Sequence, residues 1–383
     1  MREPMRGAIY MLLLAAAAPG QVLLNPARMP PRLRSLEAQP GETPLRCEVD
    51  PIRPRLDFSF RFQTGYTVRV PMSQFSGKGH SWGVVMRVTP EGGQPVYLGS
   101  RTRLPEIPRT SARFELGGGY VVGEGRYRVV WQLIDDAGRV CRGQWKVDAH
   151  PARADRKVRM AMPPETVGPL YTRPSGDLHD DAPPLRITVL LDAAPISPRR
   201  TRLGARDNMM LLGTLGALLG RLPARSVRLV AFNLDQQKEL YRRDGFTLDR
   251  LPEVARALEA VQLGMIDYRT LQNRGGHLSL LADLVNGEMA AAQPADVVLF
   301  LGPLARTGER FPEHLLRRPE GAAPRFFYLQ YRPPFLRMQS TLPDLIHSLV
   351  SRLKGKVVVM NSPGDFEKGI QQIEHGGAGS PAR

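Results

Sequence analysis

The chain has 383 residues, a formal net charge of +16 and only two cysteines. This length allows two domains, each with its own hydrophobic core. The positive charge would suit an acidic partner, but the basic residues are spread along the chain in an Arg-, Ala- and Pro-rich composition. Because there is no block of consecutive basic residues and no aromatic–basic signature, we expect no specific nucleic-acid partner.

The first twenty residues have the layout of a secretory signal peptide. Arg2 and Arg6 precede an apolar stretch at 9–18 that is too short to span a bilayer. We therefore expect 1–20 to be a cleaved signal peptide, with an uncleaved N-terminal anchor as the alternative. No later segment is long, apolar and free of charge, so we expect no transmembrane segment after cleavage and a secreted or periplasmic protein. The Pro- and Arg-rich segment 21–44 is predicted to be an exposed leader.

Residues 45–149 are predicted to form an all-β domain of about seven short strands separated by turns. Residues 56–62 alternate apolar and polar, and the longest strand is predicted over 126–134. A turn at 135–138 leads into a further strand over 139–147. This spacing predicts an immunoglobulin-like or fibronectin-like β-sandwich. The three tryptophans all lie in it and are expected to belong to its core: Trp82, Trp131 and Trp145.

The two cysteines, Cys47 and Cys141, flank this domain. A zinc site needs about four ligands, and neither Cys-x-x-Cys nor His-x-x-x-His accompanies them. In an exported chain a sparse, even cysteine count indicates a disulfide, whereas two buried free thiols are the alternative. The bond would close a loop of roughly 95 residues, which the chain-entropy model values at about 4–5 kcal/mol.

Residues 150–184 are rich in proline and charge and are predicted to be a linker. An acidic cluster within it lacks the spacing, the central glycine and the terminal glutamate of a calcium-binding loop. We therefore predict no metal site there. The cluster consists of Asp177, His179, Asp180 and Asp181.

From 185 to 374 apolar strands alternate with helices, which predicts a doubly wound, Rossmann-type parallel sheet. Residues 375–383 are expected to form a flexible tail. The strands are predicted at 186–192, 227–234, 239–242, 296–301, 325–331 and 356–360, and the helices at 207–222, 252–263, 278–292, 343–353 and 366–374.

Three local sequences in this region resemble the von Willebrand factor A domain. Thr188-Val-Leu-Leu-Asp192 is similar to the first strand of that family, and Gly275-Gly276-His277 to its Gly-Gly-Thr before a helix. The segment 297–302 is similar to the strand that normally ends in Thr-Asp-Gly. The chain thus resembles bacterial secreted von Willebrand factor A-related proteins, and the resemblance implies an immunoglobulin-like domain followed by a von Willebrand A-like domain.

The resemblance also implies a divalent metal site, but this sequence departs from the family at most of its ligands. Ala194 and Ile196 stand at the two serine positions, His277 at the threonine and Gly302 at the later aspartate. Only Asp192 is left, and a hard cation needs several oxygen ligands. We therefore expect a degenerate site that holds no metal, and we expect no cofactor.

The loop after strand 186–192 is rich in arginine. In doubly wound sheets, ligands bind beyond the carboxyl ends of the strands. A guanidinium group can bind a carboxylate bidentately without a metal. We therefore predict a partner-binding site there, with a solvated basic loop as the alternative. Its predicted members are Asp192, Arg199, Arg200, Arg202 and His277.

No catalytic residue is predicted, because the sequence has neither a Gly-x-Ser-x-Gly nucleophile turn nor a phosphate-binding Gly-x-x-x-x-Gly-Lys loop. The expected function is that of an exported, non-catalytic binding or scaffold protein. Its expected partner is a protein or an acidic component of the cell envelope. Two alternatives are a hydrolase acting on an extracellular polymer and a protein that binds acidic polysaccharide through arginine.

Overall fold

The computed structural model describes residues 21–38, 40–170, 185–197, 200–261, 263, 270, 272–305, 309–318, 321–332 and 344–375. The predicted signal peptide, the acidic cluster of the linker and the tail after residue 375 lie outside these residues. The chain divides into two compact units. The first unit comprises Met1–Arg55, Gln63–Ala149 and Pro164–Thr172, and the second comprises Leu56–Phe62, His150–Pro163 and Arg173–Arg383.

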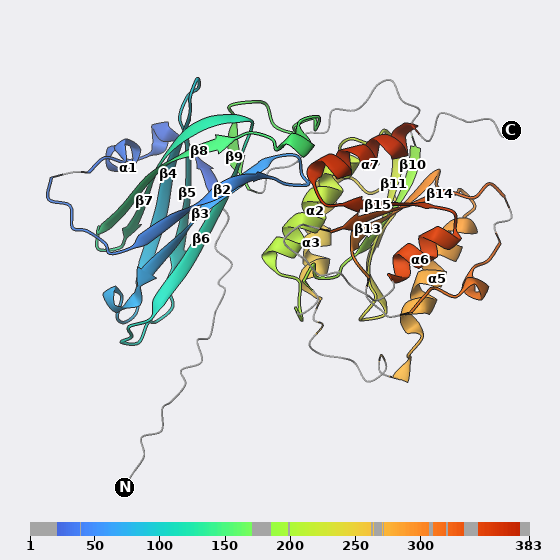
Figure 1. Ribbon diagram of the computed structural model, residues 1–383. Coiled ribbons are helices and arrows are strands. Elements are labelled where there is room, and N and C mark those ends of the chain that lie inside the picture. Colours follow the sequence, from blue (N-terminus) through green and yellow to red (C-terminus); the bar gives the residue numbers. More distant parts are fainter. Residues whose placement is uncertain are drawn as a thin grey trace, which may run out of the picture. The chain divides into compact units, whose positions relative to one another are not determined.

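The first unit is built from two sheets (Figure 1). Burial alternates along much of these strands; in the longest strand Tyr127 and Val129 are buried between exposed or half-buried neighbours. The five-stranded sheet has the order β1 (Val22–Leu24), β5 (Val96–Arg103), β4 (Ser81–Pro90), β7 (Gly125–Asp135) and β8 (Val140–Ala149). The four-stranded sheet has the order β2 (Glu48–Leu56), β3 (Phe62–Pro71), β6 (Arg113–Val122) and β9 (Val167–Pro169).

The predicted disulfide is confirmed. Cys47 and Cys141 are bonded, with their α-carbons 6.1 Å apart. Cys141 lies on β8, the edge strand of the five-stranded sheet, and Cys47 directly precedes β2, the edge strand of the four-stranded sheet. The bond therefore links an edge of one sheet to an edge of the other. The 94-residue separation makes this a long loop, the case in which a cross-link most reduces the entropy of the unfolded chain.

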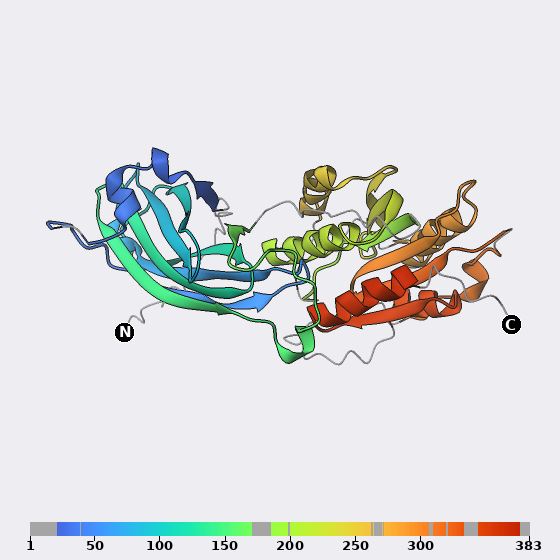
Figure 2. The same cartoon turned by 90° about the horizontal axis from the view of Figure 1, so that it is seen from above.

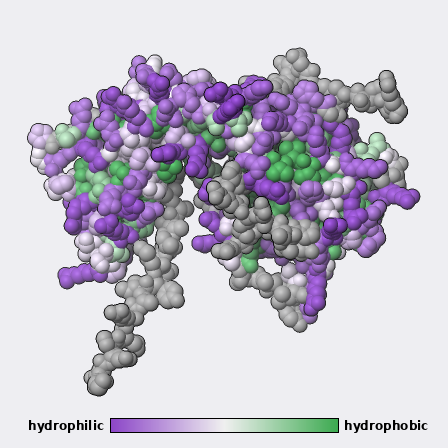
Figure 3. Space-filling model, in the orientation of Figure 1, coloured by the Kyte–Doolittle hydropathy of each residue, from purple (hydrophilic) through white to green (hydrophobic). Residues whose placement is uncertain are grey.

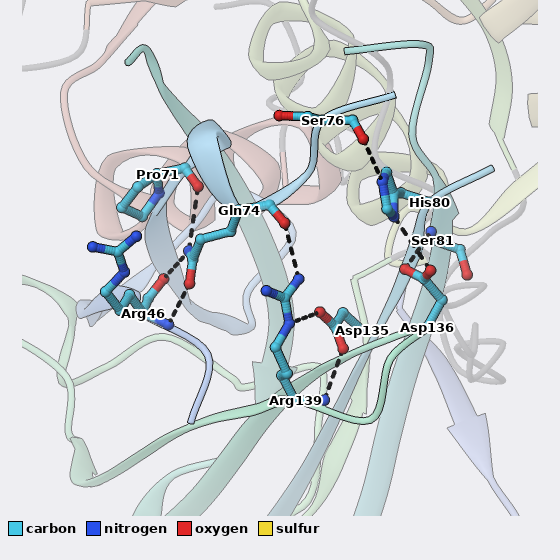
Figure 4. Close-up of polar contacts among 9 residues, drawn as sticks. All are labelled: Arg46, Pro71, Gln74, Ser76, His80, Ser81, Asp135, Asp136 and Arg139. Carbon is cyan, nitrogen blue, oxygen red and sulfur yellow. Dashed lines mark hydrogen bonds and ion pairs between the residues drawn. The ribbon is translucent and has the colours of Figure 1, made fainter. Parts of the chain in front are cut away.

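A set of polar contacts surrounds the hairpin turn before Cys141 (Figure 4). Arg139 donates to the fully buried Asp135 carboxylate through its backbone N–H (2.7 Å) and its Nε (2.6 Å), and its Nη2 donates to the Gln74 carbonyl (3.0 Å). The Gln74 side chain in turn exchanges two 2.9 Å hydrogen bonds with the Arg46 backbone. These contacts tie the turn to the residue next to Cys47 and so hold both ends of the disulfide in place.

On the other side of the same turn, His80 lies between Asp136 and the Ser76 carbonyl, at 3.2 Å from each (Figure 4). Burial acts to raise the pKa of Asp136, but hydrogen bonds from the Ser81 N–H and from His80 hold this pKa below its ordinary value. The ionised Asp136 therefore anchors the start of β4 to the hairpin turn.

The segment predicted to be an exposed leader carries regular structure. It contains β1, which is the edge strand of the five-stranded sheet, and a short helix, α1 (Pro31–Ser35), which lies over this sheet (Figure 2). Met29 and Leu36 are buried there against Val85 and Tyr97. The segment thus covers the apolar part of the outer face of this sheet.

The strand predicted over 56–62 does not form as one element. β2 ends at Leu56, and β3 begins at Phe62, with a tight turn between them. The Asp57 carboxylate accepts hydrogen bonds from the backbone N–H groups of Ser59 (2.9 Å) and Arg61 (3.3 Å), and Phe60 adopts a positive φ of 58°. An aspartate that bonds the backbone two residues on favours a turn over a strand. The buried Phe60 ring belongs to the core of the second unit.

The second unit contains a six-stranded sheet (Figure 1). Four of its strands run parallel to β10, and β12 runs antiparallel to β11. The central strand β10 is buried over almost its whole length, as expected for a strand covered on both faces. The order is β12 (Lys238–Arg243), β11 (Ala224–Asn233), β10 (Leu185–Asp192), β13 (Val297–Pro303), β14 (Arg325–Tyr331) and β15 (Lys356–Met360).

Helices bury their apolar stripes on this sheet. One core contains α2 (Ala205–Leu219), α3 (Leu251–Glu259) and α7 (Pro363–His375) together with Val189 and Leu191 of β10. The opposite core contains α5 (Gly276–Met289) and α6 (Leu345–Arg352) with Leu190 of β10. Single turns of 3-10 helix lie at Pro26–Arg28, Met72–Gln74, Arg153–Asp155, Leu248–Arg250 and Glu313–Leu315.

The predicted fold class is wrong. The described residues form fifteen strands in three sheets with few helices, so the chain is predominantly β. The six-stranded sheet is mixed, because the short connection 234–237 returns β12 antiparallel to β11. A doubly wound, Rossmann-type von Willebrand A-like domain is therefore not indicated. Apolar periodicity identifies strands, but it does not fix the direction in which each strand enters a sheet.

Candidate functional site

Asp192 ends β10 with its carboxyl group buried. The residue is 1% exposed, and neither carboxylate oxygen has a hydrogen-bond partner among the described residues. Burial raises the pKa of Asp192 well above its ordinary range, and the nearby Asp235 and Asp344 carboxylates raise it further. The structure therefore favours the protonated, uncharged form of Asp192.

The neighbouring strands of the sheet surround Asp192 closely. Gly302, the last residue but one of β13, lies so near to it that a Cβ on this glycine would come within 2.7 Å of the Asp192 Cβ. In the next strand Gln330 pairs with Gly302, and the Nε2 of Gln330 donates to Asp344 Oδ2 at 2.5 Å. Asp344 also caps α6 by accepting the His347 N–H at 2.9 Å. The carboxyl ends of three strands and the start of one helix therefore converge here.

The remaining carboxyl group of the site, Asp235, follows β11. Burial raises its pKa, and His277 acts against this shift. His277 lies in the first turn of α5, its side chain is 15% exposed, and its Nε2 lies 3.5 Å from Glu309 Oε2. The predicted members Asp192 and His277 are thus connected electrostatically through Asp235.

Within the described parts of the chain, no three His, Cys, Asp or Glu side chains are arranged to hold a metal ion. The three carboxyl groups instead share a buried region in which each pKa is raised by burial. For Asp192 the neighbouring Asp235 and Asp344 carboxylates add to this rise in pKa, because close carboxyl groups resist ionising together.

The predicted arginines lie on the loop 193–204, which follows Asp192. Asp207, buried in the first turn of α2, accepts hydrogen bonds from the backbone N–H groups of Ile196 (3.1 Å) and Gly204 (2.8 Å). The Asp207 carboxylate also lies 3.5 Å from Nη1 of Arg200, whose side chain is 53% exposed. Arg202 is exposed as well. Arg199 lies outside the described residues.

Three members of the buried cluster were not predicted from the sequence: Asp235, Gln330 and Asp344. Asp235 directly follows the predicted strand 227–234, and Asp192 is the last residue of its own, so a search for acidic residues at the carboxyl ends of strands would have found both. Asp344 lies next to Pro343, where a helix was predicted to begin, which is the position of a capping residue. No sequence feature marked Gln330 as a member of the cluster, because a single polar residue in an apolar strand is also typical of a solvent-exposed edge of a sheet.

Hydrophilic residues cover most of the face visible in Figure 3, and hydrophobic residues show only in limited patches. The large hydrophobic side chains that are exposed among the described residues are Val22, Leu23 and Ile52, all in the first unit. In the described part of the chain, no helix is both long enough and apolar enough to cross a membrane.

No protein-family model matches this chain, and a search of the curated proteins finds no match. Among solved structures, it is similar to the putative ApaA protein from Bordetella pertussis, with 14% identity over 29% of this chain and 99% of that one, at a TM-score of 0.21. A hypothetical protein from Pyrococcus horikoshii OT3 matches with 11% identity over 30% of this chain and 99% of that one, also at a TM-score of 0.21.

A β-glucuronidase from Bacteroides uniformis matches with 10% identity, at a TM-score of 0.20. This match covers 82% of the chain but only 45% of the enzyme. Similarities at these TM-scores carry no argument about fold or activity. The comparisons therefore show no family for this chain and give no support to a von Willebrand A-related one.

Proposed function

We propose that this chain is an exported, non-catalytic binding protein whose second unit contacts an acidic partner through the arginines of loop 193–204. The observation that carries the proposal is the anchoring of this loop by Asp207, which bonds the backbone at Ile196 and at Gly204. A loop tied at both ends presents its side chains with less loss of conformational freedom on binding.

Arg200 has the geometry of a contact residue. Its 3.5 Å approach to Asp207 is too long for a strong hydrogen bond, and about half of its side chain is exposed. The guanidinium group therefore keeps donors available for a second carboxylate, which it can bind bidentately. Arg202 adds a second exposed cation two residues further on. Such contacts weaken with salt, since exposed charges are screened over about 8–10 Å.

Asp192 has a supporting role in this proposal. At 1% exposure it is out of reach of a partner, and in its protonated form it does not offset the positive charge of the loop. The loop begins at Ala193, whose carbonyl accepts a 2.8 Å hydrogen bond from Asn233 Nδ2 and whose N–H donates to the Phe232 carbonyl. These bonds fix the first residue of the loop to β11.

The disulfide supports export, because such bonds persist in oxidising compartments. The arrangement of polar contacts around both of its ends fits a bond that belongs to the folded state.

One observation favours a hydrolase instead. Asp192, Asp235 and Asp344 all have raised pKa values, and general acids in enzymes are tuned in this direction. The burial of Asp192 disfavours this alternative, because a general acid must come within hydrogen-bond reach of its substrate. Hydrolysis of a polysaccharide by the purified chain, abolished by Asp192→Asn, would establish it.

The binding proposal is tested with a hexaglutamate peptide as the probe, by isothermal titration at low salt. We expect the double variant Arg200→Glu, Arg202→Glu to bind at least about tenfold more weakly than the unaltered chain. The matched control, Arg225→Glu with Arg243→Glu, makes the same change of charge at two exposed positions. These lie toward the other end of β11 and on its partner strand. Equal losses in both pairs, or no loss in the first, would place the interface elsewhere.

A further inference from the structure

The outer face of the five-stranded sheet carries a group of cations that the function proposed above does not use. Along β7, Arg126 and Arg128 point away from the buried Tyr127 and Val129, because side chains alternate across a strand. On the neighbouring strand β8, Lys146 is exposed next to the buried Val147. We name the group the basic trough and define it by Arg87, Arg126, Arg128, Arg142 and Lys146.

The strand register places these cations together. Arg128 is paired with Lys146 of β8 and with Thr89 of β4. Arg87 is two residues from Thr89 on β4 and therefore lies diagonal to Arg128 on the same face. Like charges that face each other across a strand pair destabilise the sheet. The Arg128–Lys146 pair is thus a cost to the free protein, which an anion bound between the two side chains would remove.

The surface is hollowed at this place. One hollow of about 830 Å³ is lined by Arg87, Arg126, Arg128 and Lys146, together with the buried Tyr127. A second hollow of about 460 Å³ is lined by Arg87, Arg128 and Arg142 and by residues around Leu36. Both hollows are lined by Arg87 and Arg128, so they adjoin each other on the face formed by β4, β7 and β8.

The N-terminal segment ends at the edge of these hollows. It covers the apolar half of the sheet face with Met29 and Leu36, while the basic half stays open. Arg142 joins the two halves: its guanidinium donates to the Leu36 carbonyl and to Gln132, both at 2.7 Å, and pairs with Glu42 at 2.5 Å. The trough therefore has a fixed wall at one end.

The acidic groups near the trough offset part of its positive charge. Glu91 lies 3.7 Å from Arg126 with both side chains about two-thirds exposed, so this pair is weak and screened. Glu37 and Asp148 are the other carboxylates of the two hollows. Arg142 is paired with Glu42, and Arg126 faces Asp148 across the β7–β8 pair. Five cations against four acids leave an excess of positive charge, which centres on the cross-strand pair Arg128 and Lys146.

We propose that the basic trough binds an extended anionic polysaccharide, carrying carboxylate or sulfate groups. The two adjoining hollows extend over three strands and are lined by several cations, which suits a chain with repeated anionic groups. Proteins that bind single-stranded nucleic acid place exposed aromatic rings under the bases. The aromatic residue that lines the trough, Tyr127, is 3% exposed, and its hydroxyl donates to the Gly123 carbonyl at 2.9 Å.

The test measures binding of the unaltered chain and of Arg128→Gln, Lys146→Gln to immobilised heparin and to polygalacturonate. We expect the double variant to bind at least about tenfold more weakly to the preferred polysaccharide. The matched control is Arg53→Gln, Arg55→Gln, which removes two exposed cations from β2 in the four-stranded sheet. We expect it to bind within about twofold of the unaltered chain. The ratio between heparin and polygalacturonate distinguishes sulfated from carboxylated ligands.

Thermal unfolding provides a second measurement. The double variant Arg128→Gln, Lys146→Gln no longer has the like-charge pair, so we expect its melting temperature at low salt to equal or exceed that of the unaltered chain. Weaker polysaccharide binding by this variant would then not result from unfolding. Equal losses in both variant pairs, or no polysaccharide binding by the unaltered chain, would overturn the proposal. Tighter binding of oligothymidine or hexaglutamate in the trough would show that the ligand class is wrong.

Discussion

Asp192 and Gly302 touch across two parallel strands of the six-stranded sheet, and the contact leaves no room for a side chain at residue 302. A Cβ placed on Gly302 would lie 2.7 Å from the Asp192 Cβ and 3.1 Å from its carbonyl oxygen. The glycine is therefore required by the close approach of the two strands. The absence of a side chain at 302 and the buried, unpaired carboxyl group at 192 are parts of one packing arrangement.

This contact predicts that Gly302→Ala destabilises the chain by about 1–3 kcal/mol, the usual cost of overpacking a core. The measurement is urea unfolding at neutral pH. Gly287→Ala is the matched control, because a Cβ at this position in α5 meets nothing within 4 Å. In a helix interior that change should be stabilising by about 0.5–1 kcal/mol. A Gly302→Ala variant as stable as the control would mean that β10 and β13 are further apart than described.

Asp192→Asn tests the charge state of the buried carboxyl group. Burial raises the pKa of Asp192, so the folded state keeps a proton that the unfolded chain releases above its own, lower pKa. The stability that this proton provides is present below the unfolded pKa and is lost as the pH rises through the folded pKa. The asparagine side chain of the variant does not ionise, so the variant does not lose this stability as the pH rises.

We therefore expect Asp192→Asn to be more stable than the unaltered chain at pH 7, by an amount on the order of 1–3 kcal/mol, and equally stable at pH 3. Urea unfolding at the two pH values provides the comparison. If the variant is less stable at pH 7 than the unaltered chain, the carboxylate is ionised and paired in the folded protein.

Asp207→Ala should loosen the arginine loop. The variant loses two backbone hydrogen bonds at the start of α2 and the contact with Arg200, so unfolding should require about 1–3 kcal/mol less. Trypsin should also cleave faster after Arg200 and Arg202. Asp283→Ala, at an exposed position of α5, is the control and should change neither quantity by much. Unchanged cleavage in Asp207→Ala would show that other contacts fix the loop.

Removal of the disulfide should weaken the first unit. Replacing both Cys47 and Cys141 by serine is expected to lower the free energy of unfolding by about 2–5 kcal/mol, because the unfolded chain regains the entropy of a long loop. Unfolding followed by tryptophan fluorescence reports on this unit, in which Trp82 and Trp131 are buried. An unaltered transition, or two free thiols titrated in the oxidised wild-type chain, would contradict the prediction.

The sequence was most informative where one periodicity dominates. The alternation over 126–134 corresponds to β7, and the apolar run 186–192 to β10. The strand prediction was wrong at 56–62, because Asp57 accepts hydrogen bonds from the backbone and forms a turn there. The alternation of apolar residues carries no information about these hydrogen bonds. The prediction was also wrong for the fold class, since the antiparallel direction of β12 depends on a short connection and on tertiary pairing.

The candidate site was predictable only in part. Asp192 and the disulfide could be identified from local sequence, because a strand end and a pair of cysteines are local features. The association of Asp192 with Asp235, Gln330 and Asp344 depends on which strands are neighbours in the sheet. The anchoring role of Asp207 was likewise hidden, because its partners at 196 and 204 belong to a loop without periodicity.

The most direct test of the binding proposal is hydrogen–deuterium exchange of the full chain with and without hexaglutamate at low salt. We predict that saturating peptide slows exchange in the loop 193–204 and in the first turn of α2, and that Arg200→Glu, Arg202→Glu removes this protection. Protection confined to β12 or to strands of the first unit, with the loop unchanged, would contradict the account.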